Sequence, residues 1–118
     1  MNVAIHKLIE ELEKLGLTRG WNDAEIVKYG YGIGDCKATF ITIYKKREYC
    51  TVFSELDISR GGEYFMNESK NYKTLDFMEN PIIRFAIISE MKASITRYKE
   101  LRVQFKKQQI EKDFANEI

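Results

Sequence analysis

The chain has 118 residues, of which 44% are hydrophobic and 31% are charged, and its formal net charge is +1. This composition excludes disordered and collagen-like chains, and two cysteines are too few for a disulfide-stapled scaffold. The near balance of charge excludes a global field that would attract DNA or an anionic membrane.

The apolar stretches of the sequence are too short to cross a membrane. The longest, residues 81–88, contains Arg84, whereas a membrane-spanning helix needs about 20 apolar residues. The amino terminus shows no secretory signal pattern. We therefore expect a cytoplasmic protein with reduced thiols, no membrane partner and no cofactor.

The first predicted element is an amphipathic helix over residues 3–15. Its apolar positions recur at spacings of three and four, which is the helical period: Ile5, Leu8, Ile9, Leu12 and Leu15. Asn2 can cap its start, and Gly16 can adopt the left-handed conformation that ends a helix. The opposite face is charged, as is typical of a helix on a domain surface.

Residues 17–35 allow two interpretations. Asn22 followed by Glu25 resembles a capping box, which would begin a short helix. Residues 25–31 also alternate as a strand does, and a turn-prone segment follows at residues 32–35. We favour the strand.

Residues 36–45 and 48–56 predict a β-hairpin, because both are rich in β-branched and aromatic residues and only a short polar turn separates them. Pairing Tyr44 with Tyr49 sets the register. The same register creates three further pairs: Ile43 with Cys50, Ile41 with Val52, and Phe40 with Phe53. One face then carries mainly aliphatic side chains: Ile41, Ile43, Cys50, Val52 and Leu56.

The other face of this hairpin is aromatic, with Phe40, Tyr44, Tyr49 and Phe53. Such a face is similar to the platforms on which single-stranded bases stack. Aromatic residues at strand spacing are more often buried beneath a helix or a second subunit. Tyr44 and Tyr49 are therefore candidates for contact with a partner.

Residues 59–80 mix glycine, polar and aromatic residues. This mixture predicts a turn, a short edge strand at residues 63–66 and a helical turn at residues 75–78. Asn80 and Pro81 then fit the N-cap and the first position of a helix.

The final helix should run from about residue 81 to 114, because no further glycine or proline follows. It would be roughly 51 Å long, whereas a compact chain of this size has a radius of gyration of roughly 13 Å. Part of the helix should therefore project. The fold class is α+β, as one domain over residues 1–118, in which a first helix and this long helix flank a small antiparallel sheet of two to four strands.

An apolar stripe on the long helix keeps near-heptad spacing through Met91, Ile95, Tyr98, Leu101 and Phe105. A projecting helix would expose this stripe, so we predict a homodimer held by a coiled coil. The alternative is that the stripe covers the sheet of its own domain.

Four basic side chains fall on one flank of that stripe: Lys92, Lys99, Arg102 and Lys106. Residues 89–118 contain 7 basic and 5 acidic residues. The flank could meet an acidic protein surface or phosphate groups, and it could also be the solvated side of a coiled coil. We select the four residues as the leading contact with an acidic partner.

Catalytic patterns are weak. His6 is the only histidine, and the two cysteines lack the spacing of zinc ligands. Three carboxylates could gather at one end of the hairpin, as in a metal-dependent nuclease: Asp35, Glu55 and Asp57. The lysine that follows such an acid on its strand is absent here.

These features predict a non-enzymatic binding protein. Residue types with AT-rich codons number 51 and those with GC-rich codons 20, which suggests an AT-rich gene. By analogy, the chain would be an accessory protein of a phage or mobile element that binds a host protein, such as an anti-CRISPR or antirestriction inhibitor of a host nuclease. A nucleic-acid-binding protein that uses the basic helix and the aromatic sheet is the alternative. A metal-dependent nuclease is a more distant one.

Overall fold

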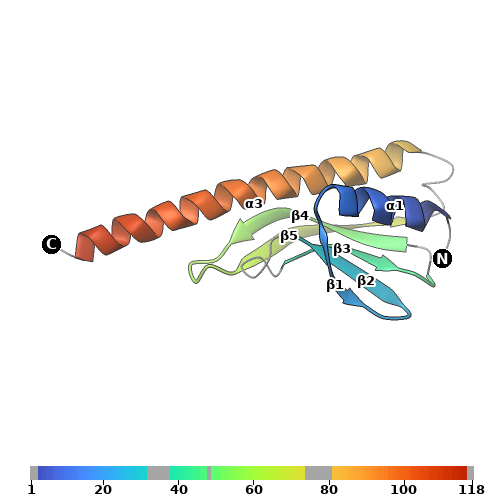
Figure 1. Ribbon diagram of the computed structural model, residues 1–118, viewed down its shortest axis with the longest axis horizontal. Coiled ribbons are helices and arrows are strands. Elements are labelled where there is room, and N and C mark those ends of the chain that lie inside the picture. The colour runs from blue at the N-terminus through green and yellow to red at the C-terminus, as the bar shows by residue number, and fades with distance from the viewer. Residues whose placement is uncertain (1–2, 32–37, 48, 74–80, 117–118) are drawn as a thin grey trace.

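The computed structural model describes residues 3–31, 38–47, 49–73 and 81–116, and it places two helices on one side of an antiparallel sheet (Figure 1). The helices are α1 (Val3–Lys14) and α3 (Pro81–Asn116). The strands follow one another in the same order in the chain and in the sheet: β1 (Thr18–Asn22), β2 (Ile26–Gly30), β3 (Thr39–Tyr44), β4 (Tyr49–Ile58) and β5 (Tyr64–Lys73). The α+β class and both flanking helices are confirmed. Within the described residues the sheet has five strands, so the expectation of two to four was wrong.

Several sequence-based expectations concern residues outside these described ranges. They are the Asn2 cap, the turn at residues 32–35, the position of Asp35, the thiol of Cys36, the helical turn at residues 75–78 and the Asn80 cap.

The end of α1 follows from a single glycine. Gly16 has a φ of +91°, which is the left-handed region that L side chains avoid. Its N–H donates to the carbonyl of Glu13 at 3.0 Å, and the N–H of Leu17 donates to the carbonyl of Leu12 at 3.2 Å. These two bonds form a Schellman motif, so the predicted termination at Gly16 is confirmed.

A tight turn at Asp23 joins β1 to β2. One carboxylate oxygen of Asp23 accepts hydrogen bonds from the backbone N–H groups of Glu25 and Ile26, each at 2.8 Å, and the other accepts one from the indole of Trp21 at 3.0 Å. These donors, Ile26 first, stabilise the charged carboxylate and lower the pKa of Asp23. The strand interpretation is confirmed, and the capping box at Asn22 was wrong because a turn occupies its place.

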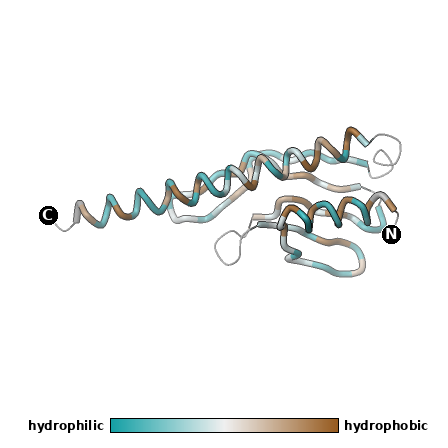
Figure 2. Tube along the Cα trace, turned by 45° about the horizontal axis from the view of Figure 1, so that its top comes forward, coloured by the Kyte–Doolittle hydropathy of each residue, from teal (hydrophilic) through white to brown (hydrophobic). Residues whose placement is uncertain are grey.

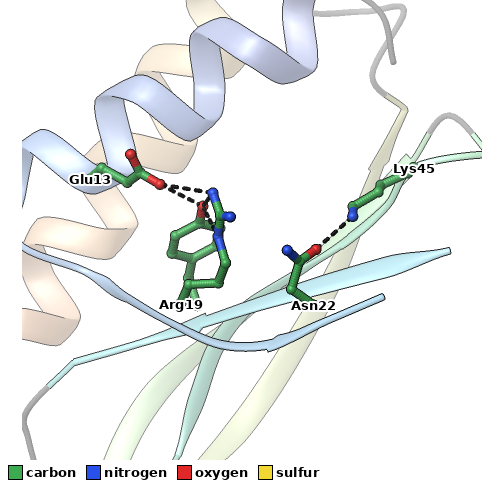
Figure 3. Close-up of polar contacts among 5 residues, drawn as sticks. Glu13, Arg19, Asn22 and Lys45 are labelled. Atoms are coloured by element: carbon green, nitrogen blue, oxygen red, sulfur yellow. Dashed lines mark hydrogen bonds and ion pairs between the residues drawn. The ribbon is translucent and has the colours of Figure 1, made fainter. Parts of the chain in front are cut away.

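Polar contacts fasten β1 and β2 to their neighbours (Figure 3). The buried hydroxyl of Tyr29 donates to the carboxylate of Glu13 at 2.9 Å, and the guanidinium of Arg19 contacts both groups at 3.0 to 3.1 Å. Burial is the main reason that the pKa of Tyr29 is raised. At the end of β1, the ammonium of Lys45 donates to the side-chain carbonyl of Asn22 at 2.6 Å.

The central hairpin has the predicted register. Tyr44 lies opposite Tyr49, Ile43 opposite Cys50, and Ile41 opposite Val52. The expected pair of Phe40 with Phe53 lies beyond the paired residues. All five side chains of the aliphatic face are buried, as expected: Ile41, Ile43, Cys50, Val52 and Leu56.

Phe40 does not belong to the aromatic face. The pairing of β2 with β3 shifts by one residue between Tyr29 and Gly30, and such a bulge redirects side chains. Phe40 is fully buried, and the ring of Tyr31 lies 6.4 Å from it and 5.5 Å from the ring of Tyr98 on α3. Phe40 therefore packs on the side of the sheet that the helices cover.

The first half of α3 packs on β4, where its apolar stripe completes the core. Four residues that we assigned to a dimer seam are buried inside the single chain: Met91, Ile95, Tyr98 and Leu101. They pack in the chain's own core, which is the alternative that the sequence left open for this stripe, and the homodimer stays a prediction. The same spacing of apolar residues suits a coiled coil and packing on a sheet, and in the single chain the stripe packs on the chain's own sheet.

Candidate partner-binding surface

The second half of α3 continues past the end of the sheet (Figures 1 and 2). A helix of 36 residues is about 54 Å long. The molecule measures 62 Å along its longest axis but 28 and 23 Å along the others. The projection that the sequence predicted is therefore present, and Leu101 is the last buried residue of α3 before it among the described residues.

A groove of about 470 Å³ lies between this part of α3 and the tip of the β4–β5 hairpin. The hairpin contributes Ile58, Gly62 and Tyr64, and the helix contributes Arg102, Phe105, Lys106, Gln109 and Ile110. Aromatic and aliphatic side chains form most of the lining, and two cationic side chains stand among them. Such a site can hold an apolar side chain that is flanked by carboxylates.

The hairpin tip is shaped by hydrogen bonds around Ser59. The N–H of Gly62 donates to the carbonyl of Ser59 at 3.0 Å, and the N–H of Glu63 donates to its hydroxyl at 3.1 Å. Gly62 has a φ of +86° and carries no side chain, so the ring of Phe105 packs directly on its backbone. Gly62 and Phe105 thus line the groove side by side.

Three large apolar side chains continue from the groove along the outer side of α3. Val103, Ile110 and Phe114 are 67%, 56% and 65% exposed. Their spacings of seven and four residues put them on one face of the helix. We call these three residues the outer stripe. Apolar side chains exposed along one face of a projecting helix are available for contact with a partner.

The four predicted basic residues divide into two pairs. All four are exposed, but only Arg102 and Lys106 line the groove. The ammonium of Lys99 lies 6.0 Å from the centre of the Tyr31 ring, at the junction with the sheet. Lys92 lies two turns of helix earlier, on the part of α3 that covers the core.

The structure does not bring Tyr44 and Tyr49 to this surface. Their rings stack with centres 4.4 Å apart at an angle of 21°. Tyr49 and Ile58 stand at opposite ends of β4, nine residues or about 30 Å apart. A smaller groove of about 320 Å³ lies beside Tyr44, with Lys46 among its lining residues, and it is remote from the α3 surface.

Sequence reasoning missed the contribution of the hairpin to the groove. Ile58, Gly62 and Tyr64 were not singled out, although the Gly61–Gly62 pair does indicate a turn. No local pattern shows that this turn meets Phe105, because the two positions are distant in the chain. Only the packing of α3 along β4 brings them together.

The acidic residues near the hairpin are the sequence's candidates for metal-dependent chemistry. Within the described ranges, no group of three or more histidine, cysteine, aspartate or glutamate side chains could hold a metal ion. Glu55 and Asp57 do share a second groove, described below, while Asp35 lies outside those ranges. Cys50 is a free buried thiol, and burial raises its pKa to about 12.

No helix among the described residues is both long and apolar enough to cross a lipid bilayer. The chain matches no protein-family model, no curated protein and no solved structure.

Proposed function

We propose that this chain is a non-enzymatic binding protein that recognises an acidic protein partner through the groove between the β4–β5 hairpin and α3. One observation carries the proposal: the groove combines an apolar lining with Arg102 and Lys106, and it continues into the outer stripe on a helix that projects from its domain. An apolar anchor of the partner would fill the groove, and neighbouring carboxylates would meet the two cations.

The charge of α3 favours an acidic partner over a second copy of the chain. Residues 99–110 contain four basic residues and one acidic residue. Lys92, Lys99 and Lys106 recur every seven residues, so a parallel pair of these helices would set like charges against each other along the contact. A partner with carboxylates at the same positions would gain attraction instead.

The apolar content of the surface favours a protein over a nucleic acid. Phosphate binding needs exposed cations and gains nothing from Val103, Ile110 and Phe114. The formal net charge of +1 also provides no general attraction for a polyanion. Binding of nucleic acid remains a defined outcome of the experiment below.

A pair of labelled peptides tests the proposal. One is an amphipathic helical peptide of leucine and glutamate, and the other has lysine in place of every glutamate. Fluorescence anisotropy should show binding of the acidic peptide only. The double variant Arg102→Glu and Lys106→Glu should weaken that binding at least about tenfold, through lost attraction and new repulsion. Ile110→Ser should weaken it through loss of apolar contact.

Lys73→Glu is the matched control, because it makes the same change of charge on an exposed lysine at the far end of β5. It should leave binding unchanged. Equal binding of the two peptides would contradict the proposal. Salt-sensitive binding of a single-stranded or double-stranded oligonucleotide, lost in the double variant, would establish the nucleic-acid alternative instead.

The finer proposal is that the partner is a host protein and that the chain inhibits it, as an accessory protein of a phage or mobile element. Support comes from the AT-rich codon types, the short chain and the projecting helix, which could cover the working surface of an enzyme. Expression in cells that carry a restriction or CRISPR system should raise the plating efficiency of a targeted phage. The double variant should not. Unchanged plating in every system tested would reject an antirestriction or anti-CRISPR role.

A further inference from the structure

A second groove, of about 520 Å³, lies between α3 and the middle of β4. It is separate from the partner groove, because its helix residues lie between Glu90 and Arg97, one to several turns before Arg102. Three elements form its walls, since Asn67 of β5 joins residues of α3 and β4. Its size falls in the range of small-molecule sites.

The groove opens where β4 departs from regular strand geometry. Glu55 has a φ of +57°, in the left-handed region, although it is not a glycine. The side-chain amide of Asn67 donates to the carbonyl of Glu55 at 3.0 Å, and Nε of Arg97 donates to the carbonyl of Leu56 at 3.4 Å. β5 and α3 thus hold the irregular segment from both sides, and the opening is part of the fold.

A buried hydroxyl lines this groove. Ser94 of α3 is 4% exposed, and its hydroxyl has no hydrogen-bond partner within the part of the chain that the structure describes. Buried hydroxyl groups in native proteins are nearly always hydrogen-bonded. The side chain of Ser94 is therefore available to a bound molecule.

The charge of the lining selects the kind of molecule. Glu55, Asp57 and Glu90 contribute three carboxylates, against the one guanidinium of Arg97, which also lies 3.9 Å from Glu100. Glu55 and Asp57 belong to β4 and Glu90 to α3, and no group of three described acidic, cysteine or histidine side chains could hold a metal ion. A cation with several donors spread over a larger volume suits this arrangement, as guanidinium and ammonium groups do.

We propose that this groove is a binding site for an organic cation with a guanidinium or ammonium head group, which donates to the carboxylates of Asp57 and Glu90 and to the hydroxyl of Ser94. The head group could come from a free small molecule or from a basic side chain of a peptide. The proposal does not depend on the partner groove.

Two probes distinguish the sources: agmatine, and the blocked peptide Gly-Arg-Gly. Each is titrated into the full chain while backbone amide signals are followed by NMR. We expect saturable shifts confined to residues 54–57 and 90–97 with at least one probe, and the tighter probe identifies the source. Glutamate, as an anion of similar size, should produce no saturable shift.

Three variants test the contacts. Asp57→Asn and Glu90→Gln should each weaken binding about tenfold, since each removes a charge-assisted hydrogen bond. Glu111→Gln is the control, because it makes the same change on an exposed glutamate of α3 outside the groove. Ser94→Ala should weaken binding while leaving the melting temperature unchanged or higher, because it removes an unsatisfied hydroxyl.

Three results would overturn the proposal. They are the absence of saturable shifts with both probes, an equal loss of affinity in Glu111→Gln, and a saturable response of the same residues to Mg²⁺ alone. The first would leave the groove without a cationic ligand. The second would show general surface attraction, and the third would show a metal site instead.

Discussion

The ring of Phe105 packs on the backbone of Gly62, so closely that a Cβ atom at Gly62 would lie 3.1 Å from Cζ of the ring. This contact joins the projecting half of α3 to the tip of the β4–β5 hairpin. Both residues line the groove to which we assign partner binding. A side chain at position 62 would disturb the contact and the groove.

Gly62→Ala should therefore destabilise the fold by about 1 to 2 kcal/mol, because alanine strains a left-handed backbone and presses on Phe105. Gly61→Ala is the matched control. Its φ is not positive, and the nearest atom to its Cβ would be Oγ of Ser59 at 3.9 Å. Urea denaturation measures both variants, and equal stabilities would contradict the contact.

Two substitutions that insert a charge on α3 should differ in their effect on stability, because one site is buried and the other is exposed. Ile95 is 9% exposed and faces the sheet, whereas Val103 is 67% exposed on the outer stripe. Ile95→Glu should lower the free energy of unfolding by at least about 3 kcal/mol, since it buries an unpaired charge. Val103→Glu should cost less than about 0.5 kcal/mol.

Denaturation together with light scattering checks this pair of variants. A normally stable Ile95→Glu protein that changes only from dimer to monomer would restore the coiled-coil seam that the sequence suggested. Loss of the folded chain without that change of mass would agree with the structure.

The turn at Asp23 should make stability depend on acid pH. Its backbone donors hold the pKa of the folded carboxylate below the usual value, near 3.9 for an unfolded chain. The contribution is therefore fully present above about pH 4 and is lost as the pH falls through the lower folded pKa. Asp23→Asn keeps an acceptor oxygen but no charge. The variant should therefore have a lower free energy of unfolding than the wild type at neutral pH, and this difference should shrink as the pH falls. A constant difference from pH 7 to pH 2 would disagree.

Cys50 should make stability depend on alkaline pH. Burial raises its pKa to about 12 in the folded chain, whereas an unfolded thiol ionises near pH 8.5. Between these values only the unfolded state loses the proton, so the free energy of unfolding falls by up to about 1.4 kcal/mol per pH unit. Cys50→Ala removes this loss, and chemical denaturation of both proteins from pH 8 to pH 11 measures the difference. Parallel pH profiles would show that the thiol is not buried.

Local rules of the chain determined its most regular elements. The spacing from Ile5 to Leu12 and the glycine at position 16 specify α1 and its end, since both depend on residues within a few positions of one another. The Tyr44–Tyr49 register likewise follows from alternation across a short turn. Pro81 marks the first residue of α3, and no later glycine or proline interrupts it.

Two features were not predictable from the sequence: the strand β1 and the position of Phe40 in the core. The sequence of β1, from Thr18 to Asn22, has no alternating apolar pattern, and all five of its residues are exposed. The strand forms through its pairing with β2. Phe40 was placed by simple alternation on the aromatic face. A one-residue shift between β2 and β3 moved it to the core, and no rule based on neighbouring residues includes such a shift.

The tertiary structure also decided the role of α3. A stripe such as Met91, Ile95 and Tyr98 can cover a sheet or a second helix equally well, because both surfaces accept side chains at the same spacing. The sheet occupied that stripe in the single chain and left the outer stripe exposed. The groove at Arg102 and Lys106 arose from the same packing, since its two walls are distant in the chain and meet only after α3 lies along β4.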